Sequence, residues 1–363
     1  MESLILFLVV NNTQLYNAIN IKMTMYEDMS ADLCLCGDWS KKGLYERLVD
    51  SKIFKNVFIH KDKYDGDQSI KGKVRKAVSY LSSDSRLQEK LSFLPQYYNS
   101  LFLSGPSMTS IEVYYYLKKR CTIKLNIFEE GIFEYYMYSY KQNMPRRIYS
   151  KIIFRSFYLD DCKDVYVYDK TLILNVPNDV TLHSIPKPCS TKLISLMNDI
   201  FQFKSDNVEE FRICQFLYLE QEFPTMEENE RQKEIIRNLY GLIGARLLVK
   251  LHPRSKVDKY CDVGVMAVKT KSSMELIEMN LQINPQIVFT INSSAVFNFY
   301  SIFHCESKVV FLYKIFDSVT IDDSFEFYMK NFKCKYGNSS VYVPESKEEL
   351  LNCIQGDINA SSV

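Results

Sequence analysis

The chain has 363 residues, too many for one ordinary core and enough for two domains. Its 45 Lys and Arg residues balance 44 Asp and Glu residues, so a nucleic-acid partner is not expected. A hydrophobic fraction of 47% excludes a disordered chain.

The amino-terminal half alternates apolar runs with helical patterns. Residues 4–10 are too few to cross a membrane and lack the flanks of a signal peptide, so they predict a buried parallel strand in a cytoplasmic protein. Further strands are predicted at 31–37, 55–61, 100–107 and 124–136 (running into a loop), with helices at 15–26, 40–51, 70–95 and 109–121. This alternation predicts a mostly parallel sheet covered on both faces.

Residues 164–189 carry three prolines and no helical period, so we expect the connection between two domains there, with a boundary at 185/186. The second half resumes the alternation. Strands are predicted within 211–223, 245–255, 261–269, 285–291 and 307–316, with helices at 228–243 and 273–283. Two doubly wound domains would bind a ligand in the cleft between them.

An apolar strand ends in His252-Pro253-Arg254. Ligands of open α/β sheets bind at the carboxyl ends of the strands, and Pro253 holds His252 extended. An imidazole there can donate to a phosphate or protonate a leaving group. A histidine satisfied within a turn is the alternative.

Asn292-Ser293-Ser294 joins a predicted strand to a helix. Two hydroxyls and the free amides of a helix start favour an anion, although either serine could simply cap the helix.

Glu129-Glu130-Gly131 ends another strand. One of two adjacent carboxylates can have a raised pKa and act as a general base, but exposed Glu-Glu pairs are also common.

These motifs, with residues 10–18 after the first strand, occur in the order and rough spacing of bacterial sialyltransferases. The chain most resembles glycosyltransferase family 52, the lipooligosaccharide and capsule sialyltransferases. It shares three short motifs with polysialyltransferases. The resemblance spans nearly the whole chain.

The resemblance implies a GT-B fold of two Rossmann-like domains facing a central cleft, with the acceptor on residues 1–185 and CMP-sialic acid on residues 186–363. His252 matches the histidine that meets the donor phosphate and acts as general acid, and Ser293 and Ser294 match the phosphate-binding hydroxyls. The other implied donor contacts are Pro253, Arg254, Asn292 and, at the ribose, Glu275 or Glu278. The implied acceptor contacts are Asn12, Thr13, Gln14 and Gly131.

Several carboxylates are candidates for the catalytic base. Glu222 best matches an acidic residue that the family has after the first strand of its second domain, and Glu220 is second. Glu129 and Glu130 match the acidic pair. We take Glu222 as the base, with Glu130 shaping the acceptor site.

The implied reaction is an inverting transfer of sialic acid from CMP-sialic acid to a terminal galactose-type sugar of a bacterial lipooligosaccharide or capsule. No metal or other cofactor is expected, because CMP has one phosphate and no carboxylate cluster has the spacing of a metal cage. This reading leaves room for a homodimer and for peripheral contact with the inner face of the membrane. Two alternatives stay open: a glycosyltransferase using another nucleotide sugar, and a non-catalytic sugar- or nucleotide-binding scaffold.

Overall fold

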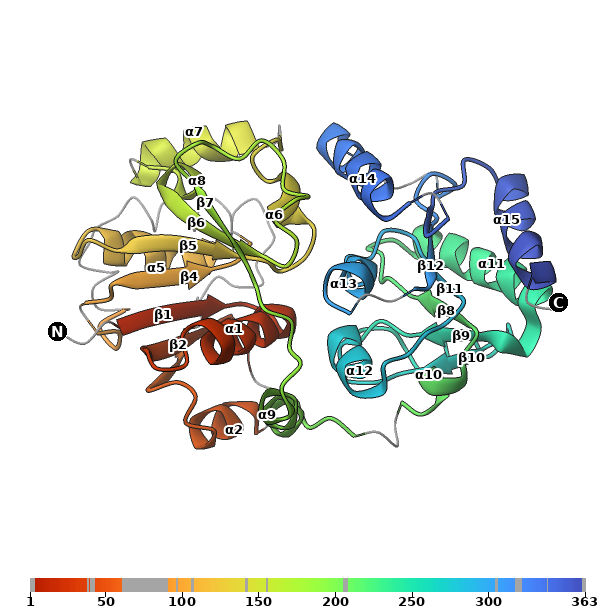
Figure 1. Cartoon of the computed structure of the whole chain (residues 1–363), viewed down its shortest axis with the longest axis horizontal. Helices are drawn as coiled ribbons and strands as arrows, with labels where there is room; N and C mark the ends of the chain where they lie inside the picture. The colour runs from red at the N-terminus through yellow and green to blue at the C-terminus, as the bar shows by residue number, and fades with distance from the viewer. Residues whose placement is uncertain are drawn as a thin grey trace. The chain divides into compact units, whose positions relative to one another are not determined.

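The computed structural model describes residues 4–37, 39, 43–60, 91–95, 97–105, 108–140, 143–154, 156–204, 208–303, 306–316, 322–337 and 339–360. The chain divides into two compact units, Met1–Gln202 (unit 1) and Phe203–Val363 (unit 2). Each unit is built on its own parallel sheet (Figure 1). The predicted α/β class with two Rossmann-like units is confirmed.

Within its described residues, unit 1 has a seven-stranded sheet in the order β3-β2-β1-β4-β5-β6-β7, parallel throughout. The strands are β1 (Leu4–Val9), β2 (Ser30–Cys36), β3 (Val57–His60), β4 (Ser100–Leu103), β5 (Lys124–Phe128), β6 (Cys162–Val167) and β7 (Thr181–Ser184). The apolar sequence of β1 places it at the centre, where helices cover both faces. Strand order reverses between β1 and β4, which is where such sheets bind ligands.

The helices of unit 1 are α1 (Asn12–Met25), α2 (Leu44–Asp50), α5 (Met108–Lys118), α6 (Phe133–Tyr136), α7 (Asn143–Phe154), α8 (Tyr158–Asp161) and α9 (Thr191–Phe201). In Figure 1, α2 and α9 lie beside the β1–β2 end of this sheet, and α7 and α8 lie beside the β6–β7 end. Helix α1 begins directly after β1 because the Asn11 side chain caps it, accepting from the Gln14 amide at 3.0 Å.

Unit 2 repeats the pattern. Its described strands form a parallel sheet in the order β10-β9-β8-β11-β12-β13, which reverses between β8 and β11. The strands are β8 (Phe216–Leu219), β9 (Leu247–Lys250), β10 (Met266–Val268), β11 (Ile287–Thr290), β12 (Lys308–Phe311) and β13 (Val341–Tyr342). The two units therefore present equivalent ligand edges, each within its own sheet.

The helices of unit 2 are α10 (Glu210–Ile213), α11 (Met226–Ile243), the 3-10 turn η2 (Gly244–Arg246), α12 (Met274–Leu281), α13 (Ala295–Ser301), α14 (Asp323–Tyr336) and α15 (Lys347–Ala360). A capping box between Thr225 and Glu228 fixes the start of α11. The loop that precedes it, after β8, carries part of the candidate site.

The units divide after Gln202, later than the predicted boundary at 185/186. Part of the proline-bearing segment expected to connect them is sheet, since β7 and most of β6 lie within residues 164–189 and belong to unit 1. Helix α9 also belongs to unit 1: it packs on α1 and α2, and Ile200 accepts a hydrogen bond from Arg47 Nε at 2.7 Å. Burial of Leu193, Met197 and Ile200 stabilises this packing by about 1.5–3 kcal/mol for each side chain.

Two other predictions need correction or stay open. The strand expected at 261–269 is only β10, because residues 257–264 form turns after the His252 loop. The helix expected near 70–95 falls mainly on residues 61–90, outside the described residues. Among the helices that the structure describes, none has the length and apolarity to cross a membrane.

Candidate functional site

Glu220 anchors the His252 loop from the neighbouring strand of unit 2. It directly follows β8, and its Oε2 accepts a hydrogen bond from the His252 backbone amide at 2.7 Å. Its Oε1 accepts from the Tyr260 hydroxyl at 3.0 Å and pairs with Lys259 Nζ at 2.6 Å. The Glu220 side chain is fully buried, so it supports the loop from beneath and is not positioned as a base.

His252 presents a defined edge of its ring. The Arg254 amide donates to His252 Nδ1 at 3.3 Å, so Nδ1 is the acceptor and a neutral ring carries its proton on Nε2. Burial, and then the Arg254 charge, lower the pKa of His252 below its usual 6.5. The ring is therefore mainly neutral at pH 7, with an N–H available to a phosphate oxygen.

Glu222, the predicted base, is already bound by two residues of the loop that follows β9. Its Oε2 accepts from Ser255 Oγ at 2.6 Å and lies 3.5 Å from Lys259 Nζ. The Ser255 hydrogen bond and the Lys259 charge hold the pKa of Glu222 below its ordinary value. Because a base works best with a pKa near the working pH, this environment weakens Glu222 as a base.

The Ser-Ser turn is held by the residue that follows Glu220. Gln221 Nε2 donates to Asn292 Oδ1 at 2.6 Å, and the Asn292 amide donates to Gln221 Oε1 at 2.9 Å. Ser293 Oγ makes only a long local contact, 3.4 Å from the Ala295 amide, and exposed Ser294 forms no side-chain cap. Neither serine is a strong helix cap, so both hydroxyls remain available to a ligand.

The two candidate ribose ligands on α12 differ in position. Glu275 lies in the first turn, nearest the carboxyl edge of the sheet, and accepts from Asn298 Nδ2 of α13 at 2.7 Å. Glu278 is one turn further from that edge. Both residues are buried, and burial raises the pKa of Glu278 to about 7. The topology favours Glu275 as the ligand contact and Glu278 as a core residue.

In unit 1, Glu130 lies at the reversal of strand order. It follows β5 and reaches α1, where Gln14 Nε2 donates to Oε2 at 2.5 Å and Asn11 Nδ2 donates to Oε1. Gly105, after β4, has φ +44°, and a Cβ there would lie 2.7 Å from Glu130 Oε2. Glycine at this position therefore leaves room for the half-buried carboxylate.

Glu129 has a different role from its neighbour. It is buried and accepts from the Tyr135 hydroxyl at 2.6 Å and the Tyr168 amide at 2.8 Å. Burial raises the pKa of Glu129 to about 8. Because these partners occupy its carboxylate, Glu129 stabilises the turn that carries Glu130.

Glu134, which the sequence analysis missed, closes the same turn. Its Oε2 accepts from the backbone amides of Glu130 and Gly131 at 3.2 and 3.3 Å, and Ser104 Oγ lies 3.3 Å from Oε1. Burial, and then the Glu130 charge, raise the pKa of Glu134 to about 7. Asn12 and Thr13 lie half-buried in the first turn of α1, next to this cluster.

The structure thus gathers the predicted residues into two clusters, one in each unit. Pro253 and Arg254 are exposed beside His252. Asn11, Gln221, Ser255 and Lys259 were missed as site residues, although Asn11 and Gln221 adjoin predicted positions. Within the described ranges, no group of three His, Cys, Asp or Glu side chains could hold a metal ion.

Solved structures share this arrangement of two units. They include a sialyltransferase GT-B domain from Photobacterium damselae (14% identity, 94% of this chain and 99% of that one, TM-score 0.50). Phytolacca americana UGT2, complexed with UDP-2fluoro-glucose and pterostilbene, has 12% identity over 98% and 90%, with a TM-score of 0.58. A UDP-GlcNAc 2-epimerase from Neisseria meningitidis, bound to UDP-GlcNAc, has 11% identity over 100% and 92%, with a TM-score of 0.53. At these identities the likeness defines the fold, which is GT-B.

The family follows from the sequence. The model of the alpha-2,8-polysialyltransferase (POLYST) family matches residues 42–312, and the chain belongs to this family. It is therefore a glycosyltransferase of the sialyltransferase kind, as predicted. Membership of glycosyltransferase family 52 in particular stays a prediction. No curated protein sequence matches the chain.

Proposed function

We propose that the chain transfers sialic acid from CMP-sialic acid to the end of a bacterial surface glycan, with the donor on unit 2. One observation carries the donor site. Two consecutive residues after β8, Glu220 and Gln221, fix the His252 loop and the Asn292 turn to the same end of one sheet. A histidine N–H and two hydroxyls at this edge suit a single phosphate.

In the proposed reaction a carboxylate takes the proton of an acceptor hydroxyl, whose oxygen attacks C2 of the sialic acid. The bond between C2 and the phosphate oxygen breaks, and CMP leaves with the electron pair. His252, through its Nε2–H, and the two serines donate hydrogen bonds that stabilise the charge that grows on the phosphate. Because the ring is mainly neutral, the general-acid role expected from the sequence is not part of this proposal. Attack opposite the leaving group inverts C2. Metal independence remains part of the proposal.

We assign the base to Glu130, reversing the choice made from the sequence. Glu222 is held as a carboxylate by Ser255 and Lys259, which lowers its basicity. Glu130 is half-buried at the ligand edge of unit 1, and the amide groups of Asn11 and Gln14 fix its orientation. Each carboxylate oxygen can accept a further hydrogen bond, which leaves room for an acceptor hydroxyl.

The proposed function has two versions, which differ in the terminal sugar of the acceptor. An α2,8 linkage, as the family description has it, requires an acceptor that ends in sialic acid. The sequence analysis expects terminal galactose. We favour the sialic acid terminus because the family match includes Glu130 in unit 1 and both the His252 loop and the Ser-Ser turn in unit 2.

The decisive assay incubates the full chain with CMP-sialic acid and acceptors ending in galactose or sialic acid, and identifies products by mass spectrometry and linkage analysis. Parallel reactions contain EDTA, or UDP- and GDP-sugars in place of the donor. We expect transfer from CMP-sialic acid alone, with or without EDTA. Transfer only from a UDP- or GDP-sugar would reject the donor. Absence of donor turnover, together with unchanged CMP binding in His252→Ala, would favour a non-catalytic scaffold.

A further inference from the structure

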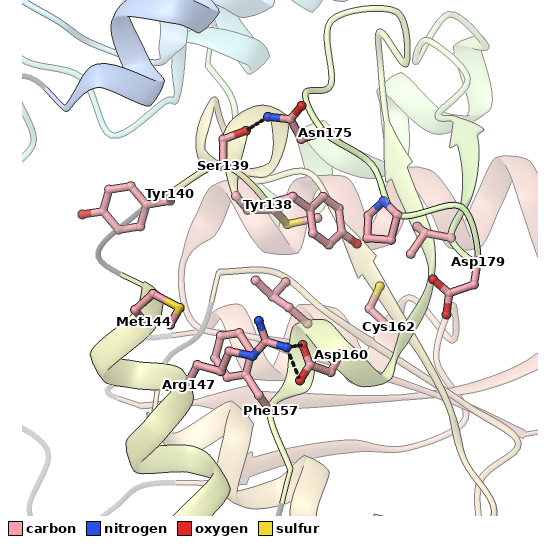
Figure 2. A pocket seen from close by; sticks show the side chains of 14 residues that line it. Tyr138, Ser139, Tyr140, Met144, Arg147, Phe157, Asp160, Cys162, Asn175 and Asp179 are labelled. Atoms are coloured by element: carbon pink, nitrogen blue, oxygen red, sulfur yellow. Dashed lines mark hydrogen bonds and ion pairs between the residues drawn. The ribbon is translucent and has the colours of Figure 1, made fainter.

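Unit 1 contains a cavity of about 570 Å³ that none of the candidate catalytic residues lines. It lies between α7, α8 and the segment that leads into β7 (Figure 2). Its volume is in the range of pockets that hold small organic ligands. The cavity is formed by residues of unit 1 alone, so its shape does not depend on unit 2.

Aromatic rings make up part of the apolar lining. Tyr138, Tyr140 and Phe157 are among the lining residues, with Tyr140 at the edge (Figure 2). Tyr140 is fixed by an edge-to-face contact with Phe133, at 5.6 Å between ring centroids. Flat, pre-positioned rings with a polar tip suit a ligand that has both apolar faces and hydroxyl groups.

Polar groups occur at two places in the same cavity. Asn175 Nδ2 donates to Ser139 Oγ at 2.6 Å, and Arg147 Nη2 lies 3.2 Å from Asp160 (Figure 2). The Tyr138 hydroxyl is buried beside the Cys162 thiol, a weak partner, and makes no other hydrogen bond to the described residues. Burial raises the pKa of Tyr138, so the hydroxyl keeps its proton and can donate to a ligand. A hydroxyl whose only partner is a thiol gains a stronger hydrogen bond from a ligand oxygen that accepts from it.

The charges in the lining are already compensated. Asp160 pairs with Arg147 and also with Lys151 at 3.1 Å, while Asp179 pairs with Lys163 at 2.5 Å. An anionic ligand would have to compete with Asp160 for Arg147 and would approach the Asp179 carboxylate. A neutral ligand rich in hydroxyl groups meets neither cost.

We propose that this cavity binds a neutral sugar unit of the acceptor glycan, apart from the end that receives the donor sugar. One face of the sugar ring lies on the aromatic lining, and its hydroxyls bond Tyr138 and the Asn175–Ser139 pair. The description of this sugar as part of an acceptor rests on the proposed function. The binding itself does not.

The test is saturation-transfer NMR and calorimetry on the full chain without any nucleotide. The probes are methyl β-lactoside and N-acetyllactosamine, with sialyllactose as the anionic comparison. Tyr138→Phe removes only the hydroxyl and its weak contact with the Cys162 thiol, so its Tm should change little. We expect it to weaken lactoside binding roughly three- to tenfold, as for one lost hydrogen bond. Tyr45→Phe is the control, because Tyr45 bonds the Val57 carbonyl elsewhere in unit 1.

A second variant tests the other polar group of the cavity, so that the result does not depend on Tyr138 alone. Asn175 has φ +51°, which glycine adopts freely, so Asn175→Gly removes the amide without backbone strain. It should weaken the lactoside by a similar factor. Binding unaffected by both substitutions, or no binding to the wild type, would overturn the proposal. Tighter binding of sialyllactose that depends on Arg147 would overturn the neutral assignment.

The two proposals fail separately. Lactoside binding that depends on Tyr138, in a chain that does not use CMP-sialic acid, would retain the cavity assignment and reject the proposed donor. The opposite result is also possible to distinguish. If the chain transfers sialic acid to acceptors with an inner lactose, and neither Tyr138→Phe nor Asn175→Gly changes the acceptor KM, the proposed function is kept and the cavity assignment is rejected.

Discussion

Gln221 and Asn292 hold each other from two neighbouring strands through a reciprocal pair of hydrogen bonds of 2.6 and 2.9 Å. Gln221 is in turn fixed by fully buried Gln232, which donates to its carbonyl at 2.7 Å and accepts from its amide at 3.0 Å. The turn that carries Ser293 and Ser294 is therefore tied to α11 through one glutamine.

Replacing this glutamine should loosen the donor site and leave the core intact. Gln221→Ala keeps the backbone bonds to Gln232 but leaves Asn292 without a partner, so we expect CMP affinity to fall about tenfold, near 1.4 kcal/mol. Calorimetry measures the affinity, and Gln202→Ala in unit 1 is the matched control. If Gln221→Ala binds CMP with wild-type affinity, the Asn292 turn does not need the Gln221 side chain to hold its conformation.

His252→Ala should lower turnover by about 10²–10³-fold, the range for loss of one hydrogen-bond donor to a developing negative charge. The fold should survive, because the bond from residue 252 to Glu220 uses the backbone amide. Steady-state kinetics test the first statement and thermal melting tests the second. A variant that turns over at the wild-type rate would remove this imidazole from the mechanism.

Glu130→Gln and Glu222→Gln distinguish the two candidate bases. Glutamine keeps the shape of each side chain and removes its basicity. We expect Glu130→Gln to lower kcat by about 10²-fold or more, and Glu222→Gln to change it only severalfold, because the amide oxygen can still accept from Ser255. The opposite ranking would restore Glu222 as the base.

The serine pair is tested by Ser293→Ala combined with Ser294→Ala. Hydrogen bonds to a charged phosphate are worth about 1.5–3 kcal/mol, so CMP should bind roughly tenfold to a hundredfold more weakly. Stability should change little, since neither side chain forms a strong cap. Unchanged CMP affinity in calorimetry would return this turn to a purely structural role.

Glu278 should make the fold less stable as the pH rises. Its pKa is raised by burial from 4.5 to about 7, and its buried Oε2 has no hydrogen-bond partner among the described residues. The native state therefore holds the proton more tightly than the unfolded chain, and this contribution is lost as the pH rises from about 4.5 to 7.

Glu278→Gln carries no charge at any pH, so its Tm relative to wild type should rise by a few degrees between about pH 5 and pH 8. Exposed Glu230→Gln is the control. A Tm difference that stays constant with pH would show that Glu278 does not ionise in this range.

The sequence predicts the sheets better than their edges. Apolar runs such as β1 and β8 have a strong signal because parallel strands are buried on both faces. The prolines before residue 189 suggested a linker, yet β7 forms the edge of the sheet, where short strands between turns are common. The place of α9 depends on contacts with α1 and α2, far back in the sequence, which no local pattern reveals.

The candidate site, like the fold, has a part that the sequence predicts and a part that it does not. The positions of His252 and of the Ser-Ser turn follow from strand ends, which local patterns reveal. The environment of each carboxylate depends on distant partners: Glu222 on Ser255, and Glu130 on Asn11 and Gln14. Composition and spacing contain no information on which of these carboxylates receives a cation, and that contact weakens Glu222 as a base.

The contact between Arg47 and the Ile200 carbonyl determines where this chain can be recombined with its relatives. A chimaera spliced at residue 185 would carry α9 from the wrong parent and would have to rebuild its packing on α1 and α2 with foreign side chains. A junction after Gln202 keeps that helix with the sheet it covers. Exchange of unit 2 among related transferases is therefore best made at that point, where every helix that packs on the sheet of unit 1 stays with its own parent.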